Sequence, residues 1–492
     1  MTKLCEALES SRYAFGKDVF VDGFTYFNAQ ERQVLESILR QARFVTVTLL
    51  GEPDSAEEMF QVSLRTRDQL TRLADQAGCP WEVRTLTSAD DSALGYLEHH
   101  FFGEGKPYQG DSSAIRVREA DTAFSEVEQT AADIRRLVAA GKCRYRDITV
   151  AARNMTDYEG TIETVFERYS IPAYLSRRSS MLEKPVWSLI TGVLSALENG
   201  LEYEDMFRWL KTGLAGLMPE ECDELENYVL TWEIHGKMWL RDVDWTDNPD
   251  GYGAPWDKRR QARLDRVNEL RRRVRAPLAE LYEGLKAGVT AGEKVNSLYS
   301  FLEHLNLQNA LEEQMRAQAE AGRLQDAEET AQLWEILCAI LDQFVEILGD
   351  EPMGTDEFSR LLRQVASQYS VGTIPVSLDQ VSVTEITRND RHTDAYLFLL
   401  GANDHVLPAV GQSGGILNDD DREELAQRGI RLAPSGMEQM GIELQNLYAA
   451  LVQPREGLVV SYPTADVSGA ELRPAFVVDR LLTLFPELRI EH

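Results

Sequence analysis

The sequence predicts an α/β protein whose parallel sheets are interrupted by a large helical segment. Three observations predict this class. Continuous apolar runs of strand length, such as Val381–Val383 and Ala395–Leu400, are typical of strands that are covered on both faces. Strand, helix and strand patterns follow one another near the N-terminus, as in a βαβ unit. Between residue 185 and about residue 368, the apolar residues recur almost purely with the helical period.

The first βαβ pattern lies within the first 55 residues. Val19–Asp22 predicts a short buried strand, and Asn28 with Glu31 predicts a capped helix start. Phe44–Leu50 predicts the next strand, which a polar turn at Gly51 ends. Because a parallel α/β domain normally supplies further strands before such a unit, we expect the chain to be a piece of a longer protein.

A second α/β stretch begins at Ala114–Val117. An amphipathic helix is expected from Phe124 to Val138, with Gly141 closing it. The strand Ile148–Ala152 then ends at Arg153.

Strand patterns return after Gly372. Helices are expected at Asp419–Gln427 and Met437–Leu451, and a last strand at Leu458–Tyr462. The predicted domains are a partial first domain (1–113), a second α/β domain in two parts (114–184 and 372–492) and a helical insertion (185–371).

Composition limits the class of protein. A chain of 492 residues is too long for one hydrophobic core, and 43% hydrophobic with 27% charged residues is typical of a folded domain. No apolar run approaches the roughly 20 residues that cross a bilayer, and no signal-peptide pattern is present, so we expect a cytoplasmic protein without membrane contact. Five scattered cysteines and seven histidines without H-x-x-x-H spacing predict no local metal site.

The net charge of −30 disfavours nucleic acid as a partner over long range, but a local basic groove can act within a Debye length of ~10 Å. One candidate is the polar loop between the two apolar runs of the first paragraph, where a sheet end is expected. Its basic and amide side chains suit a single-strand phosphate backbone, and a solvated loop is the alternative. The predicted DNA-binding residues are Arg388, Asn389, Arg391 and His392.

A second basic cluster runs from Lys258 to Arg275 and contains nine Lys and Arg residues. A duplex-contacting stripe is one interpretation. A helix face paired with Asp257, Asp265, Glu269 and nearby acidic helices is the favoured one. For the tryptophans of the helical segment, packing in the core is favoured over stacking on bases.

Several strings resemble the UvrD/PcrA-like helicase superfamily, and more closely the AddB family of B subunits of bacterial ATP-dependent helicase/deoxyribonucleases. The resemblance implies RecA-like parallel-sheet domains with a large all-helical insertion. It covers most of the chain, in the expected order. The strings are VDGFTYFNAQE (Val21–Glu31), YEDMFRWLKTGL (Tyr203–Leu214), LLGANDHVLP (Leu399–Pro408), NDDDREELAQRGIRLAP (Asn418–Pro434) and the segment Asn446–Pro463.

The motifs of active superfamily motors are degraded in this chain. Such motors carry Asp-Glu after the first of these strands, for magnesium and the attacking water, whereas this chain has Asp22 followed by Gly23. The arginine after the strand Ile148–Ala152 survives as Arg153, which could touch a phosphate or pair with a carboxylate. The last motif has Gln453 in place of its arginine. Asp22, Arg153 and Gln453 are therefore expected to be vestiges of a nucleotide site, with no catalytic residue among them.

The resemblance implies an inactivated helicase-like part of a B subunit that scaffolds and scans DNA during double-strand-break repair by recombination. It also implies an AddA-like helicase/nuclease partner in a heterodimer, and contact with single- and double-stranded DNA. Mg²⁺, ATP and an iron–sulfur cluster are expected for the longer protein, and no cofactor for these residues. Two alternatives are an ATPase motor completed by a missing phosphate-loop segment, and a docking scaffold for the A subunit without DNA contact.

Overall fold

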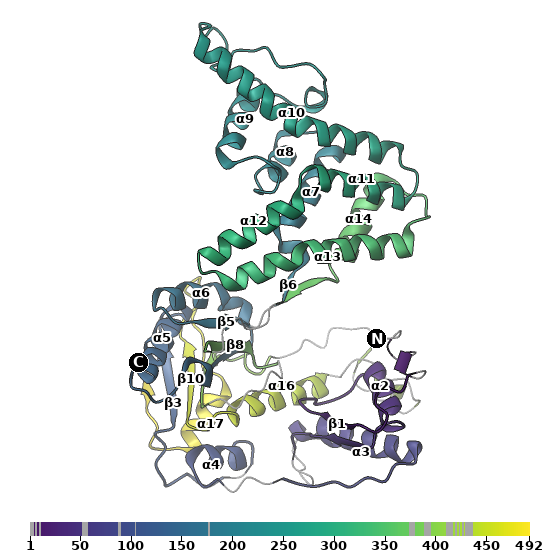
Figure 1. Ribbon diagram of the computed structural model, residues 1–492. Helices are drawn as coiled ribbons and strands as arrows, with labels where there is room; N and C mark the ends of the chain where they lie inside the picture. The colour runs from purple at the N-terminus through teal and green to yellow at the C-terminus, as the bar shows by residue number, and fades with distance from the viewer. Residues whose placement is uncertain are drawn as a thin grey trace. The chain divides into compact units, whose positions relative to one another are not determined.

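The computed structural model describes residues 4, 7–8, 11–51, 58–86, 90–103, 105–175, 178–372, 379–387, 395–409, 417–418, 421–422, 424–425, 428 and 436–492. It divides into two units, residues 1–175 with 377–492 and residues 176–376 (Figure 1). Among the helices described, each is too short or too polar to span a membrane.

The first unit is built on a sheet of seven strands, all parallel, in the order β11-β3-β10-β9-β4-β8-β5. Its strands are β3 (Ile115–Ala120), β4 (Ile148–Ala152), β5 (Ala173–Leu175), β8 (Val381–Glu385), β9 (Tyr396–Leu400), β10 (Gly457–Pro463) and β11 (Ile490–Glu491). Figure 1 shows segments from both ends of the sequence side by side, with β10 next to β3. This sheet, with the inserted helical unit, confirms the predicted α/β class.

Helices cover both faces of this sheet because side chains alternate along its strands. Phe398 and Leu400 of β9 pack under α5 (Ala123–Ala139) and α6 (Glu159–Arg168). Leu397 and Leu399 pack on the other face, with α4 (Ala93–His100), α16 (Gly436–Leu451) and α17 (Phe476–Leu484). Helix α4 comes from the segment that was assigned to the first predicted domain. The structure places it in the core of the seven-stranded sheet, where its Leu97 is fully buried.

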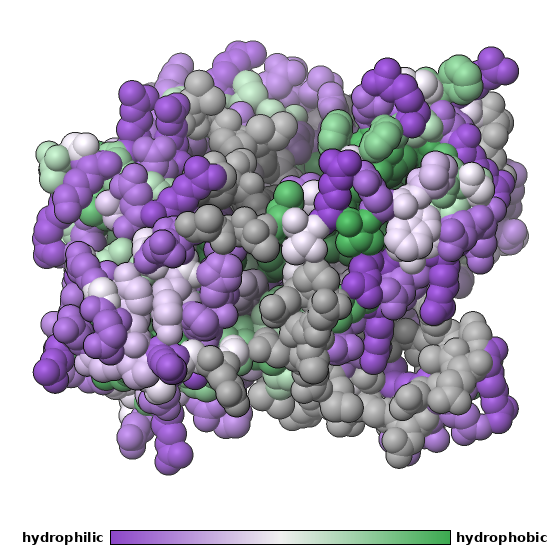
Figure 2. Space-filling view, turned by 90° about the horizontal axis from the view of Figure 1, so that it is seen from below, coloured by the Kyte–Doolittle hydropathy of each residue, from purple (hydrophilic) through white to green (hydrophobic). Residues whose placement is uncertain are grey.

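A smaller βαβ layer precedes this sheet. Strands β1 (Asp18–Val21) and β2 (Phe44–Val47) pair in parallel, and α2 (Ala29–Leu39) connects them. The predicted capping box is present, with the Asn28 side chain on the Glu31 backbone and the Glu31 carboxylate on the Asn28 backbone. The turn η1 (Glu58–Phe60) and helix α3 (Gln61–Ala77) follow. Phe20 and Phe44 stay 76% and 65% exposed, and Figure 2 shows hydrophobic surface among largely hydrophilic side chains on the right-hand side of the view.

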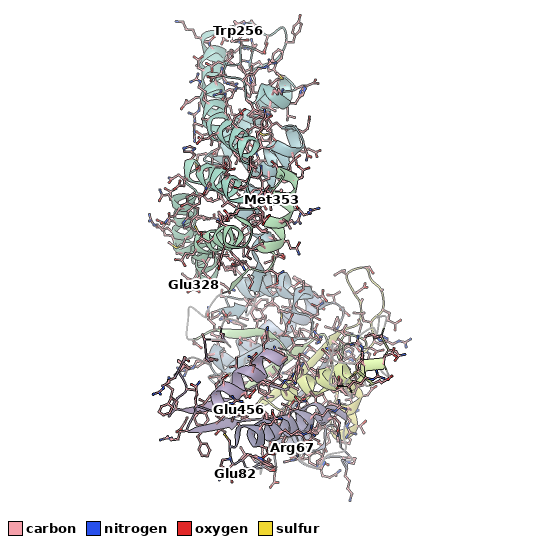
Figure 3. All side chains as sticks on the ribbon, turned by 90° about the vertical axis from the view of Figure 1, so that its right-hand side faces the viewer. Arg67, Glu82, Trp256, Glu328, Met353 and Glu456 are labelled. Carbon is pink, nitrogen blue, oxygen red and sulfur yellow. The ribbon has the colours of Figure 1, made fainter. Side chains whose placement is uncertain are left out.

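The second unit is helical apart from one short antiparallel pair, β6 (Arg178–Ser180) with β7 (Ser370–Gly372). One continuous core joins its helices, including the predicted stripe of Leu333, Leu337 and Ile340. Its helices are α7 (Pro185–Glu198), α8 (Tyr203–Leu210), α9 (Pro219–Thr231), α10 (Lys258–Ala287), α11 (Ala291–His304), α12 (Leu307–Glu320), α13 (Leu324–Leu348) and α14 (Thr355–Ala366). The predicted loop Thr246–Pro255 contains no helix or strand, and Trp256 follows it at the end of this unit (Figure 3).

Candidate functional site at the carboxyl edge of the sheet

The seven parallel strands all end at one edge, which is where open α/β sheets bind their ligands. Four chain segments leave the sheet there. Arg153 follows β4, Ile386 follows β8, Gly401 follows β9 and Thr464 follows β10. The Ile386 backbone N–H donates to the carbonyl oxygen of Ala152 (3.1 Å), which joins two of these exits. This edge is therefore the candidate functional site.

Arg153 is held by a carboxylate from α16. Its Nε and Nη2 atoms donate to the two oxygens of Glu443 at 2.5 and 2.7 Å, as a bidentate pair. Glu443 is 3% exposed, and the Arg153 side chain is 24% exposed. The hydrogen bonds that Arg153 donates to Glu443 raise the pKa of Arg153, and the carboxylate of Glu385 adds a smaller effect in the same direction. The surviving arginine thus pairs with a carboxylate, the second of the two roles that the sequence allowed.

A buried carboxylate organises the centre of the edge. Glu126 of α5 is fully buried, and its Oε1 accepts hydrogen bonds from the Gly401 N–H (3.0 Å) and Ser461 Oγ (2.5 Å). Its Oε2 accepts from Tyr158 Oη at 2.6 Å. Burial raises the pKa of Glu126, and the three hydrogen bonds oppose this shift. The carboxylate therefore ties a helix to the ends of two neighbouring strands, β9 and β10.

The turn after β9 is fixed by backbone contacts. Gly401 has φ +67°, the left-handed conformation that glycine adopts without strain. The Asn403 side chain is buried, and its amide nitrogen donates to the carbonyl oxygens of Pro463 (2.9 Å) and Arg473 (3.1 Å). The adjoining Asp404 N–H also donates to the Arg473 carbonyl (2.9 Å). The LLGANDHVLP string therefore encodes a rigid turn that binds the loop after β10.

The predicted DNA-binding residues Arg388, Asn389, Arg391 and His392 lie outside the described residues. The described chain ends at Thr387, two residues after β8, and resumes at Ala395, whose N–H donates to the carbonyl oxygen of Asp147 (2.9 Å). The role of these four side chains stays a prediction.

Asp22, another of the three residues expected to be vestiges of a nucleotide site, lies at the end of β1. Asp22 follows β1 and accepts a hydrogen bond from Thr48 Oγ1. Gly23 has φ +81°, a conformation that a glutamate would adopt only with strain. The residue after Asp22 therefore has no side chain that could orient an attacking water. Among the described residues, no cluster of three His, Cys, Asp or Glu side chains could hold a metal ion.

Helix α16 also contacts the small βαβ layer, which sequence reasoning missed. The buried Gln445 amide nitrogen donates to the Leu50 carbonyl (2.9 Å) and to Ser63 Oγ. Tyr448 packs edge to face on Phe60, with ring centroids 5.7 Å apart. A salt bridge joins Arg65 of α3 to Glu438 of α16. Gln453 follows the end of this helix, ten residues after Glu443, and its N–H donates to the Ala450 carbonyl (3.3 Å).

Comparison with known proteins agrees with the resemblance seen in the sequence. Residues 1–98 match the family model described as "ADDB, N-terminal". The B subunit of the ATP-dependent helicase/deoxyribonuclease from Geobacillus thermodenitrificans is 34% identical over 99% of this chain and 44% of its own length. The corresponding protein of Clostridium novyi is 31% identical over 100% of this chain and 43% of its own length. The chain belongs to the AddB family. It spans less than half the length of the family members that it matches.

In this member of the AddB family, six of the nine basic residues of the α10 cluster pair with carboxylates of the second unit, as favoured from the sequence. Arg266 and Arg273 share the carboxylate of Glu221 on α9, at 2.5 and 3.1 Å. The loop before α10 supplies most other partners. The loop pairs are Arg260 with Asp250 and Asp257, Arg263 with Asp250, Arg272 with Asp244, and Arg275 with Asp242. Of the partners that the sequence suggested, Asp257, Glu269 and the acidic helix α9 do pair with these arginines, whereas the contribution of Asp242, Asp244 and Asp250 was not expected.

Arg271 differs from its neighbours because it is buried. It is 1% exposed, its guanidinium lies over the Trp245 ring at 5.0 Å, and it donates to the Arg241 carbonyl. Burial lowers the pKa of Arg271. Trp187, Trp209 and Trp245 are themselves buried, which agrees with the core packing favoured from the sequence.

Proposed function

We propose that this chain is a helicase-like part of an AddB-type B subunit that holds and scans DNA without hydrolysing ATP. The proposal places it in the cytoplasm, in recombinational repair of double-strand breaks, with an AddA-like helicase/nuclease subunit as partner. The family membership supports the role, since the relatives carry the name of a helicase/deoxyribonuclease subunit. The proposal that the chain does not hydrolyse ATP rests on the residues at the ends of β1 and β4, which are the two places where a motor needs catalytic groups.

At the end of β1, the position of the catalytic glutamate is Gly23, in a left-handed backbone conformation. At the end of β4, Arg153 is engaged by Glu443 in a bidentate pair. A phosphate would have to displace a buried carboxylate to reach this guanidinium, and the exchange costs the desolvation of both groups. These features favour a scaffold over a motor.

For DNA contact, we propose the segment containing Arg388, Asn389, Arg391 and His392 over the α10 cluster. Six of the α10 arginines are paired with carboxylates, which reduces the positive charge that this face offers to phosphate. We propose no cofactor for these residues. Mg²⁺, ATP and an iron–sulfur cluster would serve other parts of the longer protein and its partner.

ATP turnover tests the non-hydrolysing role. The full-length B subunit, purified without its partner, should show no DNA-stimulated ATP hydrolysis above background. Robust turnover that Asp22→Ala abolishes would refute the proposal.

DNA binding tests the holding role. In the assembled heterodimer, Arg388→Ala with Arg391→Ala should weaken binding of single-stranded DNA and reduce the slope of log K against log salt by about 1–2, because each phosphate contact contributes ~0.7 on a single strand. The matched control is Arg316→Ala with Arg323→Ala, which removes equal charge from exposed positions on and beside α12. Equal slopes for the two double variants would point to a docking scaffold without DNA contact at this loop.

A further inference from the structure

Glu443 is an unusual residue for its position. It lies on α16, which packs on the sheet through apolar residues such as Leu447 and Leu451, and it is 3% exposed. A carboxylate is rarely buried this far without a partner that compensates its lost hydration. Arg153 is that partner, and the two residues are separated by 290 positions in the chain. The buried carboxylate of Glu443 is therefore compensated by the residue that follows β4.

The Glu443 carboxylate contacts Arg153 with the geometry that a bound anion would have. An arginine binds a carboxylate and a phosphate through the same planar fork of two parallel N–H···O bonds. Glu443 occupies this fork with both oxygens, at 2.5 and 2.7 Å. The fork lies at the carboxyl edge of a parallel sheet, the usual ligand position in open α/β folds. A second carboxylate, Glu385 at the end of β8, also acts on Arg153 and would repel an incoming polyanion.

The same helix connects this edge to the βαβ layer. Two residues after Glu443, the 1% exposed Gln445 binds the Leu50 carbonyl and Ser63. Tyr448, one turn further, contacts Phe60 and donates to the Glu98 carbonyl (2.9 Å). Displacing Glu443 from Arg153 would therefore disturb buried contacts on both sides of α16.

We propose that Glu443 is a built-in anion that fills the ligand position of Arg153, so that this edge holds α16 in place of an exchangeable phosphate. The inference deepens the proposed non-hydrolysing role and rests on it. Removing the charge of Glu443 should uncover a latent phosphate site whose affinity depends on Arg153.

The test uses inorganic pyrophosphate as the probe and the assembled heterodimer as the protein. Glu443→Gln keeps the shape of the side chain but removes its charge. This variant should bind pyrophosphate at least about tenfold more tightly than wild type at this edge, because the phosphate then gains a charge-assisted fork without displacing a carboxylate. Hydrogen exchange of the amides in β4 and α16 localises the binding.

The double variant Arg153→Gln with Glu443→Gln should lose the gained affinity. Glu312→Gln is the matched control, since it removes one carboxylate from an exposed pair with Arg316 on α12 and should leave pyrophosphate binding as in wild type. A folded Glu443→Gln protein that binds no more tightly than wild type at β4 and α16 would overturn the proposal.

If Glu443→Gln does not fold, hydrogen exchange of the wild-type protein decides. Unchanged exchange in β4 and α16 with pyrophosphate supports a filled position, and protection that disappears in Arg153→Gln overturns it. Failure of this inference is distinguishable from failure of the proposed function, because the latter is measured by ATP turnover and DNA binding.

Discussion

The buried carboxylate of Glu126 allows a quantitative prediction about the carboxyl edge. Glu126→Ala removes the acceptor of three hydrogen bonds, from Gly401, Ser461 and Tyr158. Ser461 Oγ can pair again, since it lies 3.4 Å from the Leu399 carbonyl, whereas the other two donors stay buried. Each unpaired donor costs about 1–3 kcal/mol, and the cavity adds to this, so the loss is about 3–6 kcal/mol.

Glu126→Gln should cost about 1–3 kcal/mol at neutral pH, less than Glu126→Ala. Its amide oxygen can accept from Gly401 and Ser461, whereas its amide nitrogen can only donate to Tyr158 Oη and leaves the Tyr158 O–H without its acceptor. The two variants also differ from wild type in pH dependence. Burial raises the pKa of Glu126 above its ordinary value of 4.5, so the folded state binds the proton more tightly than the unfolded state. This contribution to stability is present below pH 4.5 and is lost as pH rises from there through the folded pKa. Glu126→Gln does not titrate, so its free energy of unfolding should rise relative to that of wild type as the pH increases through the same range.

The assay must report on the first unit alone. Of the eight tryptophans, Trp81 is the one outside the second unit, so tryptophan fluorescence follows mainly the helical unit and serves as the internal control. Hydrogen exchange of the β9 and β10 amides measures the opening of the sheet. Protection factors should fall by two orders of magnitude or more in Glu126→Ala and by a smaller factor in Glu126→Gln. Equal losses in both variants would show that the ionised carboxylate is required and would refute the pairing argument.

Three further predictions concern backbone strain, a buried charge and the helical core. Gly23→Glu, which restores the residue of active motors, should cost about 1–2 kcal/mol at φ +81° and should not create ATP turnover; turnover would contradict the interpretation of this strand end. Arg271→Met should be neutral or stabilise the second unit by about 1–4 kcal/mol in urea unfolding followed by tryptophan fluorescence, because a desolvated charge is removed; a marked loss of stability would show that the contacts with Trp245 and Arg241 dominate. Phe358→Ala should cost about 3–5 kcal/mol in the same assay, since Phe358 is fully buried against Phe344, whereas the half-exposed Val345→Ala should cost far less; equal costs would argue against the packing described.

Local elements were predictable from the sequence because their signals lie within a few residues. The strand Ile148–Ala152 has the predicted bounds, and the capping box of Asn28 and Glu31 is present as expected. The helical stripe around Leu337 also follows from a short-range pattern.

The site was less predictable because its contacts join distant segments. Glu126 looks like an ordinary polar residue of an amphipathic helix, yet its partners Gly401 and Ser461 lie 275 and 335 positions away. Glu443 gives no signal of its pairing with Arg153 for the same reason. Strand order is likewise invisible in periodicity, since a period reports the faces of a strand and not its neighbours. A buried carboxylate can be inferred only once the sheet that buries it is known.

The strand order has a consequence for synthesis of the chain. Strands β3, β4 and β5, made before the helical unit, do not pair with one another; each pairs with a strand made after it, as β4 does with β8 and β9. On a ribosome that adds about 5–20 residues per second, β5 therefore waits roughly 10–40 s for β8. During that interval the helical unit can fold by itself, while the apolar N-terminal strands remain exposed. We expect nascent chains stopped before β8 to bind holding chaperones through these strands and to release them once β8, β9 and β10 have emerged.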